Sequence, residues 1–100
     1  PLTLSGLERF NFDYAFIGCA GIDLKRKLVY TVEMDTMAIK QKAMSLAKKS
    51  YLLADSSKFN VTGFCSFIST DDFEAIFSDN QINADAKDIP DNFILIDTNI

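Results

Sequence analysis

The segment Tyr51–Asn60, with the sequence YLLADSSKFN, brings together groups that could bind a ligand. Its apolar start stops at Asp55, and two serines and Lys58 follow at once. A lysine ammonium can pair with a phosphate or carboxylate, and an aspartate carboxylate can accept hydrogen bonds from hydroxyl groups. The same residue types also begin turns, in which Asp55 would only cap the residues that follow. The segment therefore predicts either one wall of a binding site or a plain turn.

A second lysine, Lys40, falls on the apolar side of a predicted helix. The helix is expected to run from about Asp35 to Lys49, with Asp35 or Thr36 as its N-cap and Lys48 near its C-terminal end. A stripe of four residues, widened on one side by two methionines, forms the apolar face: Ile39, Ala43, Leu46 and Ala47, with Met37 and Met44. An ammonium inside this face must either extend to water or meet an anion.

Four small residues in a row follow the first apolar run of the chain: Gly18, Cys19, Ala20 and Gly21. Small residues allow backbone N–H groups to approach a ligand closely. The segment is neither a Walker loop nor a G-x-G-x-x-G motif, so its spacing alone does not identify a nucleotide site. It predicts a loop that could offer backbone donors.

Four short apolar runs predict the strands that would position these groups. They occupy residues 14–17, 51–54, 75–77 and 93–96. Continuous apolar runs are typical of parallel strands covered on both faces, and ligands bind beyond the carboxyl ends of such strands. The runs end at polar or flexible residues, namely Gly18, Asp55, Ser78-Asp79 and Asp97. These residues could instead begin ordinary turns. The pattern predicts an α/β fold with a mostly parallel sheet, flanking helices and a further short strand at Leu28–Thr31.

Composition and charge exclude several classes of protein. The 100 residues, 48% of them hydrophobic, make at most one domain, and the net charge of −4 makes this piece a poor nucleic-acid binder by itself. The chain has no apolar run long enough for a membrane helix and no signal-peptide pattern. Cys19 and Cys65 are far apart and histidine is absent, so we expect no metal site and a reduced, cytoplasmic protein. Because the chain begins at Pro1 rather than Met, we expect a piece of a longer protein.

Four segments, in this order and spacing, resemble one family: FDYAFIGCAGID, EMDTMAIKQKAM, YLLADSSKF and EAIFSDN. They are similar to the C-terminal effector domain of DeoR-family bacterial transcriptional repressors. The resemblance extends from about Ser5 to Asn80 and more weakly to Ile96. It implies that residues 1–100 form the C-terminal part of the effector domain. The family's N-terminal winged helix-turn-helix and the first half of its sensor domain would then be absent from this chain.

The family's effector domain is similar in fold to ribose-5-phosphate isomerase and CoA-transferase-type proteins, which are Rossmann-like. Where the isomerases have DGADEID, this chain has IGCAGID, so two site aspartates fall at Ile17 and Ala20. The isomerases' catalytic glutamate falls at Lys40 or Gln41, and neither side chain is a carboxylate base. The DSSK segment still matches the isomerases' Asp-x-Ser-Lys near the substrate. The resemblance therefore implies a binding site that has lost its catalytic carboxylates, and no enzyme activity.

The resemblance implies an effector sensor for a phosphorylated sugar or related metabolite, without a cofactor. Lys58 and Lys40 would supply positive charge, and Asp23 or Asp55 would accept bonds from ligand hydroxyls. Backbone donors would come from residues 18–21, and Ser57 belongs to the matched DSSK segment. DNA would be bound only through the absent helix-turn-helix, in a full-length protein that is a homo-oligomer.

Two alternatives remain open. The chain could be a sugar-phosphate isomerase-like enzyme that uses Asp23, Glu33 or Asp55 as a base. It could also be a structural oligomerisation domain with contacts through Phe10, Phe12 or the Phe59–Phe67 region, whose phenylalanines are expected in the core or in a lid.

Overall fold

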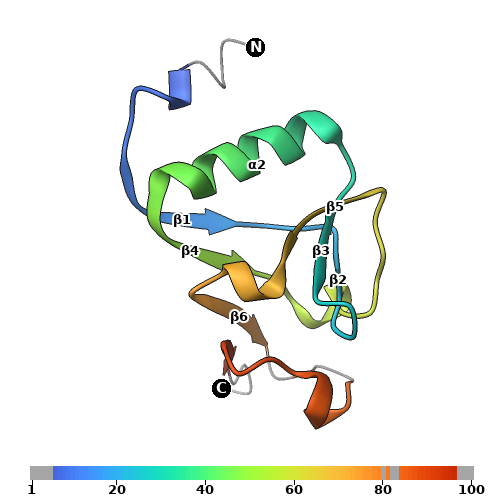
Figure 1. The fold of residues 1–100 in the computed structure, drawn as a ribbon. Helices are drawn as coiled ribbons and strands as arrows, with labels where there is room; N and C mark the ends of the chain where they lie inside the picture. Colours follow the sequence, from blue (N-terminus) through green and yellow to red (C-terminus); the bar gives the residue numbers. More distant parts are fainter. Residues whose placement is uncertain (1–5, 80, 82–83, 97–100) are drawn as a thin grey trace.

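The computed structural model describes residues 6–79, 81 and 84–96, and its main element is a parallel sheet (Figure 1). The sheet has the strand order β1-β4-β6-β7, and all neighbouring strands are parallel. Its strands are β1 (Phe12–Ile17), β4 (Ala47–Leu53), β6 (Ala75–Asp79) and β7 (Phe93–Ile96). Each contains one of the apolar runs, apart from Ala54, which follows the end of β4, so the α/β fold class with a mostly parallel sheet is confirmed. Asp97, predicted to follow the last strand, lies outside the described residues.

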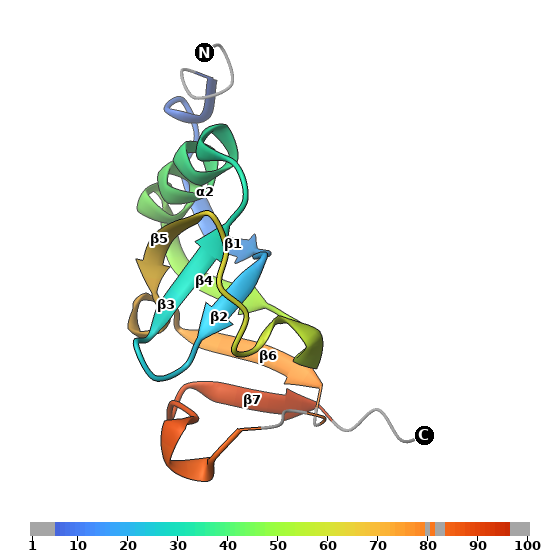
Figure 2. The ribbon, with the colours of Figure 1, turned by 90° about the vertical axis from the view of Figure 1, so that its right-hand side faces the viewer.

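A second, antiparallel sheet packs on one face of the parallel sheet (Figure 2). Its strands are β2 (Gly21–Asp23), β3 (Leu28–Thr31) and β5 (Cys65–Ser69), in the order β2-β3-β5. The predicted strand Leu28–Thr31 is confirmed as its centre, but the sequence pattern did not predict the sheet itself. Only residues 18–20 separate β1 from β2. The two sheets therefore fix both ends of the loop of small residues.

Helix α2 (Met34–Leu46) lies alongside β1, contacts both β1 and β4, and ends earlier than predicted (Figure 1). Ala47 is its C-cap, with extended backbone, and Lys49 pairs with Tyr14 of β1. Lys48 and Lys49 therefore lie in β4, because parallel pairing with β1 outweighs local helix propensity. The predicted N-caps are also wrong, since Glu33 holds that position and makes no side-chain capping bond.

The core-facing side of α2 is rotated from the predicted stripe. Met37 and Met44 pack against the core, whereas Ile39 is 37% exposed. Residues three or four positions apart share a helix face, so Lys40 and Gln41 lie between the two methionines on the inner side. The rotation turns both polar side chains toward the protein.

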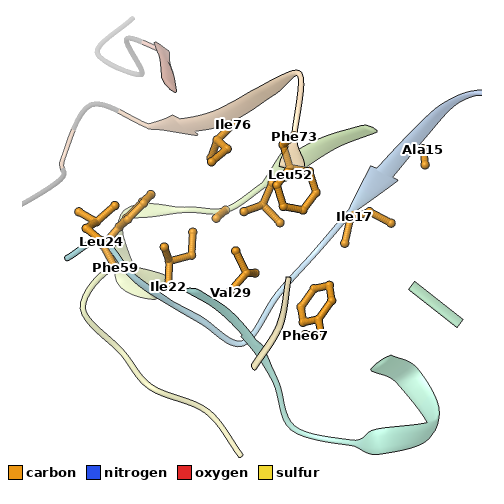
Figure 3. Packing of buried hydrophobic residues seen from close by; sticks show 11 residues of the cluster. Ala15, Ile17, Ile22, Leu24, Val29, Leu52, Phe59, Phe67, Phe73 and Ile76 are labelled. Atoms are coloured by element: carbon orange, nitrogen blue, oxygen red, sulfur yellow. The ribbon is translucent and has the colours of Figure 1, made fainter. Parts of the chain in front are cut away.

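The core lies between the two sheets (Figure 3). Ile17, Leu52 and Ile76 of the parallel sheet point toward Ile22 and Val29 of the antiparallel sheet. Loop residues complete the cluster, among them Leu24, Phe59 and Phe73, with Phe67 from β5. Burial of this apolar surface is the main favourable term that holds the sheets together.

The other face of the parallel sheet carries exposed aromatic side chains. Tyr14 and Phe16 are 58% and 62% exposed, and the Phe16 ring stacks on Tyr51 at 5.5 Å between centroids. Phe77 extends the row, 5.8 Å from Tyr51. The prediction that the strands are covered on both faces is therefore wrong within the described residues. Among the three phenylalanines expected in the core or a lid, Phe64 is 77% exposed. Across the described part of the chain, no helix has the length and apolar character needed to cross a membrane.

Candidate functional site

The carboxyl ends of the parallel strands bring the predicted loop and the predicted turn to one edge of the sheet. Ile17, the last residue of β1, pairs with Leu52, one residue before the end of β4. Leu53 in turn pairs with Phe77 of β6. Gly18, Asp55 and Asp79 therefore leave neighbouring strands at the same edge, as the continuous apolar runs predicted.

The DSSK segment folds into a short 3-10 turn, η1 (Ser56–Lys58), capped by Asp55. The Ser57 amide donates to Asp55 Oδ1 at 2.9 Å, and the Ser57 hydroxyl donates to the same oxygen. These hydrogen bonds, the hydroxyl's first, lower the pKa of Asp55 below its usual value. Asp55 and Ser57 thus bond each other, as the turn interpretation expects. Phe59, only 7% exposed, anchors the end of the turn in the core. Lys58 comes directly before it as the last residue of the turn.

Lys40 reaches from α2 to the end of β1. Its Nζ donates to the Gly18 carbonyl oxygen at 2.7 Å and lies 5.5 Å from the centroid of the Phe67 ring. Partial burial lowers the pKa of Lys40 below its usual value. The carbonyl and the ring face stabilise the ammonium, which has three N–H donors, so one carbonyl does not saturate it. Within the described residues, a carbonyl oxygen and a ring face hold the Lys40 ammonium, so it does not simply extend to water; an anion as its partner stays a prediction.

Cys19 lies within electrostatic range of both lysines. Burial raises the pKa of its thiol, while the positive charges of Lys40 and Lys58 both lower it. Asp55 acts on the same thiol in the opposite sense to the lysines. Two ammonium groups and one carboxylate are therefore close enough to Cys19 for their charges to act on it. The cluster combines residues from the β1–β2 loop, α2 and η1.

The four small residues of the β1–β2 loop serve different purposes. Among the described residues, a Cβ on Gly18 would meet no atom within 4 Å, so the backbone there faces open space. The Ala20 amide donates to the Tyr30 carbonyl at 2.9 Å and is already used by β3. Gly21 is buried, and a Cβ there would lie 2.1 Å from the Val61 carbonyl oxygen. Chain packing thus explains Gly21, whereas Gly18 and Cys19 are the loop residues at the lysine cluster.

Asp23 is occupied by the β2–β3 turn. Its Oδ1 accepts a hydrogen bond from the Arg26 amide at 3.1 Å, and its Oδ2 lies 3.9 Å from Arg26 Nε. It also lines an open hollow with Lys25 and Asn60. Asp23 is therefore the predicted site residue whose contacts point away from the cluster around Cys19.

Two further polar residues support the cluster and were not among the predicted site residues. Asp79, at the end of β6, accepts hydrogen bonds from the Ser56 amide at 2.8 Å and the Ser56 hydroxyl at 3.2 Å. Gln41 donates from Nε2 to the Phe67 carbonyl at 2.7 Å, next to the ring that contacts Lys40. The strand-end pattern already contained Asp79, and helical spacing placed Gln41 beside Lys40. Neither pattern showed that Asp79 bonds Ser56 or that Gln41 bonds the Phe67 carbonyl.

The described surface also has hollows away from this cluster. One, at the start of β4, is lined by Met44, Lys48 and Glu74 and contains none of the predicted site residues. Within residues 6–79, 81 and 84–96, no group of three histidine, cysteine, aspartate or glutamate side chains is arranged to hold a metal ion. The chemistry that the cluster supports is recognition of an anion by two lysines.

A family model described as the DeoR C terminal sensor domain matches residues 1–80. The chain belongs to this family. The resemblance found in the sequence is thereby confirmed, and the described α/β fold is consistent with a sensor domain of this kind.

Similar proteins carry names that refer to gene regulation. The L-fucose operon activator of Haemophilus influenzae is 30% identical over 92 residues, covering 92% of this chain and 34% of its own length. The uncharacterized HTH-type transcriptional regulator FruR of Bacillus subtilis is 34% identical over 79 residues, covering 79% and 31%. The HTH-type transcriptional regulator GlpR of Haloferax volcanii is 31% identical over 88 residues, covering 88% and 34%. The sensor domain described here thus spans about a third of the length of these relatives.

Proposed function

We propose that this sensor domain binds a phosphorylated sugar or related metabolite and thereby controls DNA binding by a helix-turn-helix elsewhere in the full-length regulator. The observation that carries the proposal is that the carboxyl edge of the parallel sheet holds both Lys40, bonded to the Gly18 carbonyl at the end of β1, and Lys58, in the turn after β4. Charge-assisted hydrogen bonds from ammonium groups are among the stronger contacts available to a phosphate. The open backbone at Gly18 leaves space beside the two lysines.

The proposed mechanism is a shift between two states of the regulator. A ligand favours the state that it binds more tightly, and the DNA affinity changes by the corresponding coupling free energy. The cluster joins α2, the β1–β2 loop and η1, so an anion held by both lysines would connect three separate elements of the chain. This arrangement gives the ligand a means of favouring one relative position of α2 and the sheet edge.

The contacts at the cluster favour sensing over catalysis. Ile17 and Ala20 stand where the resemblance places the isomerases' aspartates; Ile17 is buried, and the Ala20 amide is bonded to Tyr30. At the position of the catalytic glutamate, Lys40 and Gln41 bond backbone carbonyls. An isomerase needs a side chain that can take and return a proton from carbon, and the carboxylate of the cluster, Asp55, accepts two hydrogen bonds from Ser57 as the cap of η1.

The proposal also includes assembly of the full-length regulator as a homo-oligomer in the cytoplasm. Helix-turn-helix proteins commonly bind paired half-sites on DNA as dimers, so a ligand sensed in each subunit would act on the spacing of two DNA-binding units. Light scattering on the full-length regulator, with and without the sugar phosphate that it binds, measures both the assembly and its response. A monomer under both conditions would contradict this part of the proposal.

The test of the site is a titration of the full-length regulator with inorganic phosphate and a panel of sugar phosphates. Lys58→Ala should weaken binding of the preferred sugar phosphate about tenfold or more, as expected for loss of a charge-assisted bond. Lys48→Ala is the matched control, because Lys48 is 81% exposed and pairs with Asp13 at the opposite end of β4. Equal affinities of Lys58→Ala and wild type would remove Lys58 from the site. Catalytic turnover of any sugar phosphate beyond one equivalent would favour the enzyme alternative.

A further inference from the structure

Asp79 holds the DSSK turn with both oxygens of one carboxylate. Oδ1 accepts from the Ser56 backbone amide at 2.8 Å, and Oδ2 accepts from the Ser56 hydroxyl at 3.2 Å. The Ser78 hydroxyl lies 3.3 Å from Oδ1 and adds a third contact. These bonds connect the end of β6 to the first residue of η1 across 23 positions of the chain. The carboxylate is half-buried, so water competes weakly for these contacts.

The contact to Ser56 fixes the start of the turn against the end of β6. Just before it, the Ala54 amide bonds the Phe77 carbonyl at 3.1 Å and ends the pairing of β4 with β6. Just after it, Phe59 is buried in the core. Between these anchors, η1 is held internally by its cap at Asp55. Asp79 therefore determines how the turn as a whole is oriented against the sheet edge.

The orientation of η1 determines where the Lys58 ammonium lies. Lys58 is two residues after Ser56, and its amide bonds the Asp55 carbonyl at 3.0 Å, so backbone rotation at Ser56 would move it directly. A long lysine side chain needs a fixed origin if its ammonium is to meet an anion together with Lys40. Fixing the origin beforehand lowers the ordering cost that binding must otherwise meet.

We propose that Asp79 is a positioning residue of the effector site, which sets the place of the Lys58 ammonium through its two bonds to Ser56. This inference rests on the proposed function, because it assumes that Lys58 contacts the ligand. Asp79 itself does not contact the anion. The negative charge of Asp79 would repel a nearby phosphate and so lower the affinity. The position that Asp79 gives to Lys58 would raise the affinity.

These opposite effects give the test a clear sign. If Asp79 acted only as a nearby charge, Asp79→Ala would strengthen phosphate binding by the full-length regulator. The positioning role instead predicts binding of inorganic phosphate and of the preferred sugar phosphate about fivefold to tenfold weaker. Asp79→Asn keeps an acceptor for the Ser56 amide and an amide group that can bond the hydroxyl, and should recover most of the affinity. Asp71→Ala, which removes the same charge from an exposed residue paired with Lys27, should leave affinity unchanged.

A double-mutant cycle separates positioning from general damage to the fold. In the Lys58→Ala background, Asp79→Ala should have little further effect on phosphate affinity, because the ammonium that it positions is gone. An equal loss in both backgrounds, or unchanged or stronger binding by Asp79→Ala, would overturn the inference. If Asp79→Ala fails to fold, Ser56→Ala replaces it in the cycle, with an expected loss of about twofold to threefold. Full affinity in Lys58→Ala alone would instead contradict the proposed function, so the two failures are distinguishable.

Discussion

Replacing Gly21 with alanine should destabilise the sensor domain by about 3 kcal/mol, because overpacking in a tight site costs about 1–3 kcal/mol and a lost backbone hydrogen bond about 1 kcal/mol more. The new Cβ would lie 2.1 Å from the Val61 carbonyl oxygen and 2.8 Å from the Val61 carbonyl carbon. Both atoms belong to the main chain, so no side-chain rotation can relieve the overlap. The segment would have to move away from β2.

That movement is opposed by contacts on the same segment. The Asn60 amide donates to the Ile22 carbonyl at 2.7 Å, and Ile22 forms an isolated bridge with Phe59. Displacing Val61 strains both. The cost therefore includes a weakened hydrogen bond between β2 and the segment that follows the DSSK turn.

The assay is urea unfolding of the full-length regulator, followed by a signal from the sensor domain. Gly18→Ala is the matched control in the same loop, since a Cβ there meets no described atom within 4 Å and should change stability by less than about 0.5 kcal/mol. Equal stability of the Gly21→Ala and wild-type proteins would refute the packing argument. A large loss in Gly18→Ala but not in Gly21→Ala would refute the division of the loop into an open and a packed part.

Three further predictions concern the cluster around Cys19. Because burial raises the pKa of Cys19, its alkylation by iodoacetamide at pH 7.5 should be slower than that of a free thiol, and the preferred sugar phosphate should slow it further; mass spectrometry of the labelled peptide measures both. Alkylation at the rate of an unstructured cysteine peptide, with no protection by ligand, would contradict the buried position between the lysines. Burial lowers the pKa of Lys40, so affinity for a sugar phosphate should be constant near pH 8 and fall as the pH rises through that lowered pKa, before pH 10.5. Lys40→Met should bind more weakly at pH 8 and lose this part of the pH dependence, whereas an unchanged profile would place Lys40 outside the ligand site. The same lowered pKa predicts that the free energy of unfolding increases as the pH rises through this range, because the partly buried ammonium is unfavourable while it is charged.

The strands of the parallel sheet could be predicted because their signal is local. Each continuous apolar run became a strand, and the polar residues after the runs came together at one edge, since parallel strands share their direction. Lys40 could be singled out for a similar reason, because helical spacing alone places it on an apolar face. The family segments added the DSSK turn.

The features that the sequence did not reveal depend on contacts between distant residues. Helix α2 ends at Leu46 because the next residues pair with β1 and form β4, although their sequence would also fit a helix. Position 21 requires glycine because of Val61, which lies 40 positions away in the sequence. The hydrogen bonds from Ser56 to Asp79 join residues that are 23 positions apart. Local sequence patterns do not indicate which distant residues will be in contact.

The exposed aromatic face illustrates a different limit. Tyr14, Phe16, Tyr51 and Phe77 share the side of the sheet opposite the antiparallel strands. Hydrophobic runs predict that apolar surface exists, but whether another layer covers it depends on the remaining architecture. The sequence correctly predicted parallel strands here, but the predicted cover on both faces is not found among the described residues.

The most direct measurement of the central claim is NMR of lysine side chains labelled with 13C at Cε, in the full-length regulator, during titration with the preferred sugar phosphate. Lys40 and Lys58 lie at the carboxyl edge of the parallel sheet, whereas the Lys48 side chain is 81% exposed and pairs with Asp13 at the other end of β4. We predict that the signals of Lys40 and Lys58 shift together along a single saturation curve while that of Lys48 stays in place. Saturable binding that leaves Lys40 and Lys58 unshifted would contradict an effector site at this edge of the sheet.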